Sequence, residues 1–358
     1  MSTDLDLEQR YRRVLRLLPG YYRAKWEEDM VAAFLDGSLT GDADEDEFIL
    51  EFGKPTWPEI ASVADLAARL YLGGAGAPRR YFAWGQAVRG AVLAVVLVHA
   101  VVSLDALVRL AWMHRPLGVP APPASMLTST PAGLLPPAAW YLSDCAWIVV
   151  FLMLILGHYR VARVYAAPAI AGDLFWLLHG QFTGVLPASS LGPWFFWVLL
   201  NLAPVLALAA FHPDAPPVAR WPWLLALPAA YLLVDAPVLA LAATGNSALV
   251  PDNSGLFCIV IALACLAHAP RAWSRRSADS GVWSLTLSVL AAVAGAYRIA
   301  SLADYSHDPH LIKVSLAELL ILAAAAALVA ADAARAQTAR PAPPPRPGPD
   351  PDPDLLAY

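Results

Sequence analysis

The dominant pattern in the chain is a series of apolar stretches between residues 84 and 331, separated by short connections rich in Pro, Gly and Arg. The hydrocarbon core of a bilayer is about 30 Å thick, so a helix that crosses it needs about 20 mostly apolar residues. Eight stretches approach this length and predict helices at about 86–112, 137–158, 161–182, 193–211, 221–243, 255–271, 281–302 and 311–334. The pattern therefore predicts an all-α, polytopic helical membrane protein.

Two of the eight stretches depart from this pattern. The third contains Arg163, Pro168, Asp173 and His179, which dilute its apolar character, and the sixth covers only 256–270. Short or non-helical segments are tolerated at membrane depth where protein or water surrounds them. An alternative with six spans, in which these two stretches are re-entrant or interfacial segments, therefore stays open.

Composition agrees with the pattern. Hydrophobic residues make up 58% of the chain and charged residues only 15%, and the mean hydropathy is +0.53. Soluble domains carry about 25% charged residues. The three cysteines, Cys145, Cys258 and Cys265, lie inside predicted helices and fit no metal-ligand or disulfide spacing, so we expect them to be packing residues.

Arginines distinguish the two sides of the predicted bundle. Cytoplasmic connections of membrane proteins carry an excess of Lys and Arg. An eight-span path that starts in the cytoplasm places there Arg79, Arg80, Arg89, Arg160, Arg163, Arg220, Arg271, Arg275, Arg276, Arg335, Arg340 and Arg346. The opposite connections hold little beyond Arg115. We therefore expect a multi-pass protein of the plasma membrane with both termini in the cytoplasm.

Residues 1–75 mix acidic and basic residues with apolar residues at three- and four-residue spacing, which predicts two amphipathic helices. Their apolar faces consist of Leu7, Tyr11, Val14, Leu15 and Leu18 in the first, and of Tyr22, Trp26, Met30, Val31 and Phe34 in the second. Pro19-Gly20 ends the first helix, and Gly37 ends the second.

Two shorter helices follow, at 47–52 and 58–72, and we interpret the acidic run at 42–47 as a solvated loop and helix start. The glycines at 73–76 predict a flexible joint. The predicted organisation is a cytosolic helical prefix domain at 1–75, a linker at 76–84, a transmembrane helical bundle at 85–334 and a disordered, Pro-rich cytosolic tail at 335–358.

A bundle of about 70 residues is near the lower limit for independent folding. We therefore expect contact with a partner, with a second copy or with the membrane to stabilise the prefix. The candidate docking residues for a membrane or cytosolic protein are Tyr22, Trp26, Met30 and Trp57. A homo-oligomer stays possible as an alternative. The acidic residues of the prefix argue against nucleic acid as a partner.

Two segments of the prefix resemble a known family. They are RYRRVLRLLPGYYRAKWEEDMVAAFLDG, at 10–37, and EFGKPTWPEIASVADLAARLYLGG, at 51–74. The basic first helix, the aromatic and acidic stretch at 21–30 and the Gly-Lys-Pro turn are similar to the permease-prefix or HAAS-like domains of actinobacterial membrane proteins. The resemblance implies a cytosolic accessory or regulatory module without catalytic residues. The membrane part resembles uncharacterised actinobacterial multi-pass proteins, which implies no activity.

Ionisable residues inside predicted spans are the candidate functional groups, because a charge at bilayer depth costs about 2.5–3.5 kcal/mol on insertion scales. The candidates for a ligand or ion pocket are Asp105, Arg109, Asp144, Asp173, His179, Asp235, Arg298 and Glu318. Three interpretations stay open: ion pairs that hold the bundle together, which we favour, a pocket for a sensed or transported ligand, and catalysis.

Specific pairings follow from position. Asp105 and Arg109 are four residues apart and share one helix face, so they can pair. Arg298 can meet Glu318 or Asp304.

Prolines predict breaks in the fourth and fifth spans, at Pro204, Pro228 and Pro237. Broken helices line binding sites in many transporters, so the run Asp235-Ala236-Pro237 combines two signals. In the connection before the last span, Asp304, His307, Asp308 and His310 are residue types that bind zinc, but they lack a fixed ligand spacing. An ordinary polar loop is favoured there, and we expect neither a metal nor a cofactor.

The chain contains no Walker A, HExxH, GxSxG or GxGxxG motif. We therefore expect a non-enzymatic membrane protein, sensory or transport-associated, whose prefix domain docks a partner. The first alternative is a stand-alone proton-coupled transporter that uses Asp173, Asp235 and Glu318. The second, weaker alternative is an intramembrane enzyme.

Overall fold

The computed structural model describes residues 6–39, 41–74, 77–114, 137–182, 198, 202–212, 215–237, 240, 253–274, 278–302 and 308–338. All regular structure in these residues is helical, and they contain no strand. The all-α class predicted from the sequence is therefore confirmed.

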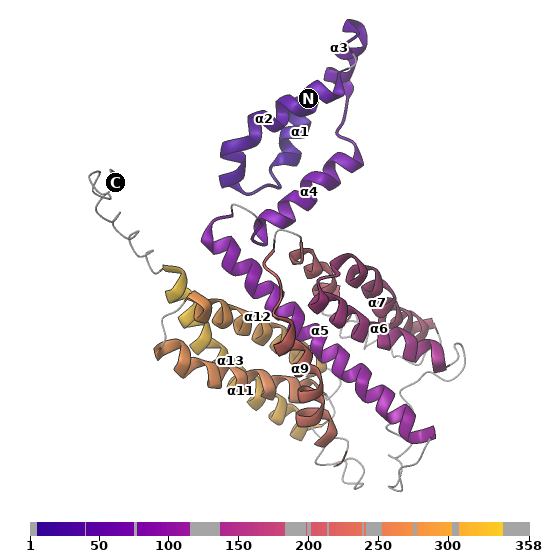
Figure 1. The fold of residues 1–358 in the computed structure, drawn as a ribbon, viewed down its shortest axis with the longest axis vertical. Coiled ribbons are helices and arrows are strands. Elements are labelled where there is room, and N and C mark those ends of the chain that lie inside the picture. Colours follow the sequence, from indigo (N-terminus) through magenta and orange to yellow (C-terminus); the bar gives the residue numbers. More distant parts are fainter. Residues whose placement is uncertain are drawn as a thin grey trace, which may run out of the picture.

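Four helices form the prefix domain, which projects from one end of the longer helices (Figure 1). They are α1 (Leu7–Leu15), α2 (Gly20–Ser38), α3 (Ala43–Phe52) and α4 (Trp57–Tyr71). Their core joins α1, α2 and α4 and consists of Tyr11, Leu15, Leu18, Val31, Val63, Ala67 and Leu70. The rings of Tyr11 and Phe34 stack with their centroids 3.9 Å apart. The two amphipathic helices predicted at the start of the chain are confirmed.

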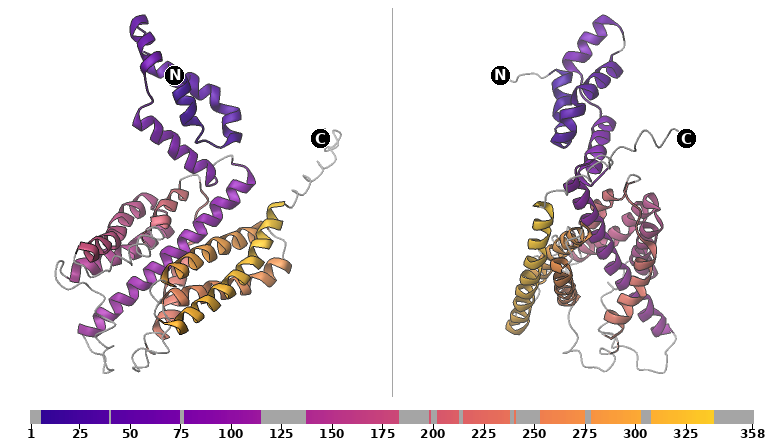
Figure 2. Two further views of the ribbon diagram at one scale, coloured as in Figure 1. Left: turned by 180° about the vertical axis from the view of Figure 1, so that it is seen from behind. Right: turned by 60° about the vertical axis from the view of Figure 1, so that its left-hand side comes forward.

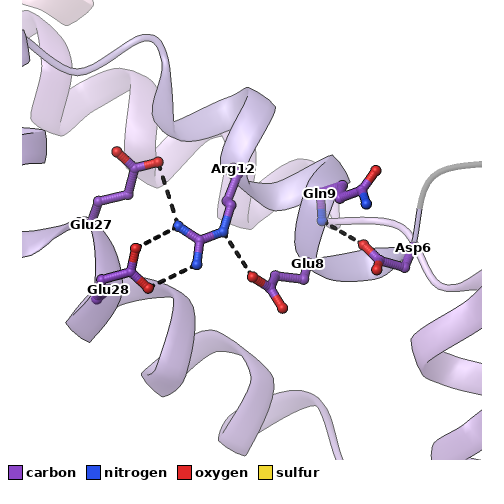
Figure 3. Close-up of polar contacts among 6 residues, drawn as sticks. All are labelled: Asp6, Glu8, Gln9, Arg12, Glu27 and Glu28. Atoms are coloured by element: carbon purple, nitrogen blue, oxygen red, sulfur yellow. Dashed lines mark hydrogen bonds and ion pairs between the residues drawn. The ribbon is translucent and has the colours of Figure 1, made fainter.

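A network of charges around Arg12 joins α1 to α2 (Figure 3). Its guanidinium donates to Glu8 on α1 at 2.8 Å and, through two nitrogens at 2.8 Å each, to both carboxylate oxygens of Glu28 on α2. The hydrogen bonds from Arg12 hold the pKa of the Glu28 carboxyl below its ordinary value of 4.5. Because the network is exposed to solvent, it adds little stability.

The helix α3 begins at Ala43, so the helix start expected in the acidic run is confirmed, four residues before the predicted bound at 47. Asp42 caps the helix, with its side chain accepting from the backbone N–H of Asp44 at 3.1 Å. Three acidic residues, at 44–46, then occupy the first turn, where the helix dipole favours negative charge. The acidic run is therefore a helix start.

The prefix meets the next helix, α5 (Arg79–His114), through a close backbone contact. Gly73 ends α4 with a positive φ of 85°, and the Gly74 N–H donates to the Arg69 carbonyl at 2.7 Å. A Cβ on Gly85 would overlap the Leu72 carbonyl oxygen, so α5 passes directly against the last turn of the prefix. The helix also starts within the segment that we predicted as a linker, at 76–84.

α5 runs obliquely through the centre of the remaining helices, with one group on each side (Figures 1 and 2). The first group contains α6 (Pro137–Leu156), α7 (Tyr159–Phe182), the 3₁₀ turn η3 (Leu208–Ala210) and α9 (Arg220–Ala230). Gly157, with a φ of 87°, makes the tight turn between α6 and α7. Residues 202–207, at the end of the fourth predicted span, are helical.

The second group is a three-helix unit of α11 (Asn253–Ser274), α12 (Ala278–Ser301) and α13 (Pro309–Thr338). Its core contains Cys258, Ile261, Ala262, Cys265, Leu287, Leu290, Ala291, Ala294, Leu322, Ala325 and Val329. Cys258 and Cys265 are free and buried, and pack in this core.

Three helical segments among the described residues are long and apolar enough to cross a membrane: Arg79–Val108, Gly281–Ser301 and Pro309–Ala336. Shorter apolar helices occupy Cys145–Leu156 and Ser254–Pro270. Large apolar side chains also remain on the outer surface, with Leu320 and Leu233 exposed to 72% and 77%. Such a surface fits a lipid environment better than water, and these features are those of a membrane protein.

Candidate functional site

The buried polar groups of the three-helix unit form the most complete cluster predicted from the sequence. Arg298, on α12, is 2% exposed, and its Nη2 lies 2.6 Å from Oε2 of Glu318 on α13. Its Nη1 donates to the Ser254 hydroxyl on α11 at 2.7 Å. The predicted pairing of Arg298 with Glu318 is therefore confirmed, while Asp304, its other predicted partner, lies outside the described residues.

Serines extend the cluster. The Ser254 and Ser301 hydroxyl oxygens are 3.1 Å apart, and Ser301 donates to the Arg298 carbonyl at 2.8 Å. One guanidinium thus joins all three helices at the end where α12 terminates. A buried cation with both a carboxylate and a hydroxyl partner is typical of a structural ion pair.

A second polar cluster, which sequence reasoning missed, joins the same helices nearer the other end. Ser284 on α12 is fully buried and donates to Oδ2 of Asp332 on α13 at 2.7 Å. The same hydroxyl lies 3.0 Å from Nε2 of His268 on α11. Because the Ser284 hydroxyl donates to the aspartate, the geometry differs from that of a nucleophilic triad, in which the serine is activated by histidine.

The two clusters are separated by the same number of residues on all three helices. On each helix, 14 residues separate the two members, as in Ser254 and His268, Ser284 and Arg298, and Glu318 and Asp332. At a rise of 1.5 Å per residue this spacing corresponds to about 21 Å. Two polar layers with an apolar core between them fit inside a hydrocarbon slab about 30 Å thick, one layer toward each boundary.

Asp235 lies in a π-helical turn of a continuous helical segment. After α9 the chain forms a π-helical turn, η4 (Tyr231–Asp235), in which the Ala236 N–H bonds back to the Tyr231 carbonyl. Pro228, inside α9, cannot donate a backbone hydrogen bond, and it disturbs the helical ladder just before this turn. The chain stays helical from 220 to 237, so the unwound turn expected near Pro228 and Pro237 is absent from these residues, and the irregularity is the π turn.

Asp235 lines an apolar cavity of about 220 Å³ between α5, α9 and α11. Its other walls include Val98 and Val101 from α5, Val234, and Phe257 and Ile261 from α11. Asp235 is the one charged residue among the described residues that line it. A carboxylate on a π turn beside an apolar cavity is a candidate binding group, since π turns frequently occur at functional sites.

The other predicted pocket residues do not join these clusters as described. Asp105 lies on α5 and is half-buried. Arg109 follows on the same helix, Asp144 lies on α6, and Asp173 and His179 lie on α7, but these four side chains are outside the described residues. The predicted Asp105–Arg109 pair and a single pocket of all eight residues therefore stay predictions.

The connection before α13 is described only from Asp308 onward, so Asp304 and His307 lie outside the described residues. Asp308 caps α13, with its carboxylate accepting from the backbone N–H groups of His310 and Leu311 at 2.9 and 3.3 Å. The described residues contain no group of three or more metal-ligating side chains. The capping role explains Asp308 without a metal.

The predicted docking residues of the prefix separate into two sets. Tyr22 and Met30 pack against the prefix core, whereas Trp26 and Trp57 are exposed to 41% and 82%. Sequence reasoning missed two further exposed aromatic residues on α3, Phe48 (64%) and Phe52 (51%), whose rings contact each other. Their spacing of four residues on an otherwise acidic helix is the signal that could have found them.

A polar cavity of about 500 Å³ lies where the prefix meets the bundle, between α4 and the start of α7. Its cationic wall includes Arg160 and Arg163, and Arg163 donates to the Phe211 carbonyl at 2.9 Å. On the prefix side, Arg69 pairs with Asp65 at 3.1 Å. Charged side chains of the prefix and of α7 thus line the same cavity.

Comparisons with protein-family models, curated proteins and solved structures find no match to this chain. The resemblance of residues 10–37 and 51–74 to permease-prefix domains therefore stays a prediction that rests on those residues.

Proposed function

We propose that this chain is a non-enzymatic integral membrane protein with about eight spans, sensory or transport-associated, whose cytosolic prefix domain docks a protein partner. One observation carries the proposal. The helix α3 buries none of its residues, and Phe48, Phe52 and the nearby Trp57 are all more than half exposed. We call these three side chains, together with Glu47 and Glu51, the α3 surface.

The chemistry of the α3 surface favours one class of partner. Its aromatic side chains would be buried in a complex, and the acidic side chains around them favour a cationic counterpart. A basic amphipathic helix supplies both, because its apolar face covers aromatic rings and its Lys and Arg residues surround them. We therefore assign a basic, amphipathic helical segment of another protein as the partner.

The arrangement of the long helices supports a path with both ends on one side. Val282, near the start of α12, shares a cavity wall with Phe82, near the start of α5. Gly281 packs against Ala336, near the end of α13, where a Cβ would lie 2.6 Å from the Ala336 side chain. The start of α5 and the end of α13 thus lie at the same end of the bundle, as an even number of spans requires. The excess of arginines in the sequence favours the cytoplasm for that end.

Site-specific photocrosslinking tests the docking role in cells that express the full chain. A crosslinking amino acid replaces Phe48, and a matched variant carries it at Leu17, which is exposed to 48% outside the α3 surface. We expect one major adduct from position 48 and none of that mass from position 17. Peptide mapping should place the crosslink in a basic, amphipathic segment of the partner.

Charge reversal distinguishes docking from chance contact. Glu47→Lys with Glu51→Lys should reduce the adduct at least fivefold, while Asp36→Lys, at an exposed position on α2, should leave it unchanged. An adduct that charge reversal does not reduce would contradict the proposal. An adduct of twice the chain mass would also contradict it, because it identifies a second copy as the occupant.

The geometry of Asp235 favours a second candidate, a proton-coupled transporter. In proteoliposomes with an imposed membrane potential, a pH-sensitive dye should then report proton movement that Asp235→Asn abolishes. Asp308→Asn, at an exposed helix cap, is the control and should retain it. Equal proton movement with Asp235→Asn, or none in the unchanged protein, would exclude this candidate.

A further inference from the structure

A third cavity, of about 470 Å³, lies at the end of the bundle from which the prefix projects. It is bounded by the first turns of α5, by the extended segment 216–219 that leads into α9, and by the first turns of α12. Three aromatic side chains, Phe82, Trp223 and Trp283, form part of its wall. The cavity therefore has a largely apolar lining near one boundary of the long apolar helices.

Arg89 also lines this cavity. The sequence places it among the arginines of the cytoplasmic side, yet in the structure it is only 4% exposed. Its Nη1 donates to the Pro216 carbonyl at 3.2 Å and its Nε to the Gly85 carbonyl of its own helix at 3.4 Å. Its Nη2 is buried and has no hydrogen-bond partner among the described residues.

The charge of Arg89 is also without a counter-ion in the described part of the chain, where both of its partners are neutral carbonyl groups. Burying a guanidinium without a carboxylate is costly, because the desolvated charge receives no compensating attraction. The N–H groups of a guanidinium match the oxygens of a phosphate group in geometry, and the two groups have opposite charges. An anion that entered the cavity and met Nη2 after a rotation of the guanidinium would satisfy both requirements.

The start of α9 provides an independent attraction for an anion. Its N-cap residue, Ala219, lines the cavity and supplies no side-chain cap, so the N–H groups of Arg220 and Trp221 lack a side-chain acceptor, while Pro222 has no N–H. The N-terminus of a helix carries a partial positive charge and unsatisfied N–H donors, which together bind phosphate groups. Arg89 and the α9 N-terminus thus face the same cavity from two different elements.

From this juxtaposition we infer that the cavity binds one phosphate group carried by an amphiphile. The phosphate lies between Arg89 and the start of α9, and the apolar part of the ligand lies along Phe82, Trp223 and Trp283. Such a ligand is either an anionic phospholipid, whose headgroup enters from the bilayer, or a soluble phosphate ester. This inference does not depend on the proposed docking role of the prefix.

Native mass spectrometry of the full chain in detergent tests the inference with three matched probes. Dioleoyl-phosphatidylglycerol carries both phosphate and acyl chains, dioleoylglycerol lacks the phosphate, and glycerol 3-phosphate lacks the chains. We expect one retained phosphatidylglycerol per chain and at least tenfold lower occupancy by dioleoylglycerol. Retention of glycerol 3-phosphate as well would identify a soluble ester as the source, and retention of the phospholipid alone would identify the bilayer.

Two variants make the test specific. Arg89→Gln should lower phosphatidylglycerol occupancy at least tenfold, whereas Arg160→Gln, at an exposed position on α7, should not change it. Ala219→Asp places a carboxylate at the N-cap, where it satisfies the helix N–H groups and opposes the anion. We expect this variant to fold at least as stably as the unchanged chain and to lose the lipid. Occupancy that is equal for phosphatidylglycerol and dioleoylglycerol, or unchanged in both cavity variants, would overturn the inference.

Discussion

Breaking the ion pair between Arg298 and Glu318 should destabilise the three-helix unit more than any surface change. Glu318→Gln keeps the shape of the side chain but removes its charge. Arg298 would then remain 2% exposed without the Glu318 carboxylate, while its hydrogen bond to the Ser254 hydroxyl would persist. Removing one partner of a buried ion pair costs about 3–5 kcal/mol. Because Glu318 is itself 14% exposed, we expect the lower end, about 3 kcal/mol.

Removing both charges should be less harmful than removing one. In the double variant Arg298→Met with Glu318→Leu, apolar side chains of similar size replace the pair, and such replacements are often neutral. We therefore expect a loss of about 1 kcal/mol or less in the double variant. In the cycle of the unchanged chain, Arg298→Met, Glu318→Leu and the double variant, we expect a coupling energy of at least 2 kcal/mol. Equilibrium unfolding of the full chain in mixed micelles, followed by circular dichroism, measures all four free energies.

Asp332→Asn serves as the control, because Asp332 accepts a hydrogen bond from Ser284 and forms no ion pair among the described residues. Its loss should be about 1 kcal/mol, as expected for one hydrogen bond. A loss below about 1 kcal/mol for Glu318→Gln, or a double variant that loses the sum of the two single losses, would refute the assignment of this pair as a buried structural contact.

Three further predictions concern other parts of the chain. Gly85→Ala should push the prefix away from α5, because the new Cβ overlaps the Leu72 carbonyl. Proteolysis between α4 and α5 should therefore accelerate. Gly20→Ala is the control, because a Cβ there meets open space, and it should leave the rate of proteolysis unchanged. Asp308→Ala should remove the cap of α13 and cost about 1 kcal/mol, and Asp308→Asn, which keeps the acceptor, should cost much less in the same unfolding assay. The lowered pKa of Glu28 should make the prefix lose stability as pH falls below 4.5, since the carboxylate favours the folded state only while ionised. Arg12→Gln should remove part of this dependence, and the reactivity of a cysteine placed at the buried Val31 measures it.

Much of the fold was predictable because apolar length and periodicity are local properties. The helices of the three-helix unit and the breaker at Pro19 follow directly from the order of residues. Two errors arose at helix starts. The helix predicted from 47 begins at Ala43 because Asp42 caps it, and α5 begins at Arg79 because Pro78 precedes a segment without a helix breaker.

Some polar sites were predictable from local sequence, and others depend on how distant helices pack. Arg298 and Glu318 were predictable, since a lone charge in an apolar helix requires a partner. The cluster of His268, Ser284 and Asp332 was not, because it exists only through the relative register of three helices. Arg89 was counted as a surface cation, since nothing local shows that the distant segment 216–219 packs over it.

Because Leu72 and Gly85 are in close backbone contact, a rotation of the prefix would be transmitted to α5. α5 has 36 residues and is about 54 Å long. A tilt of about 5° at the prefix would therefore displace the far end of the helix by about 5 Å. Since the apolar cavity beside Asp235 lies along α5, an event at the prefix could change the width of that cavity without any ligand reaching it.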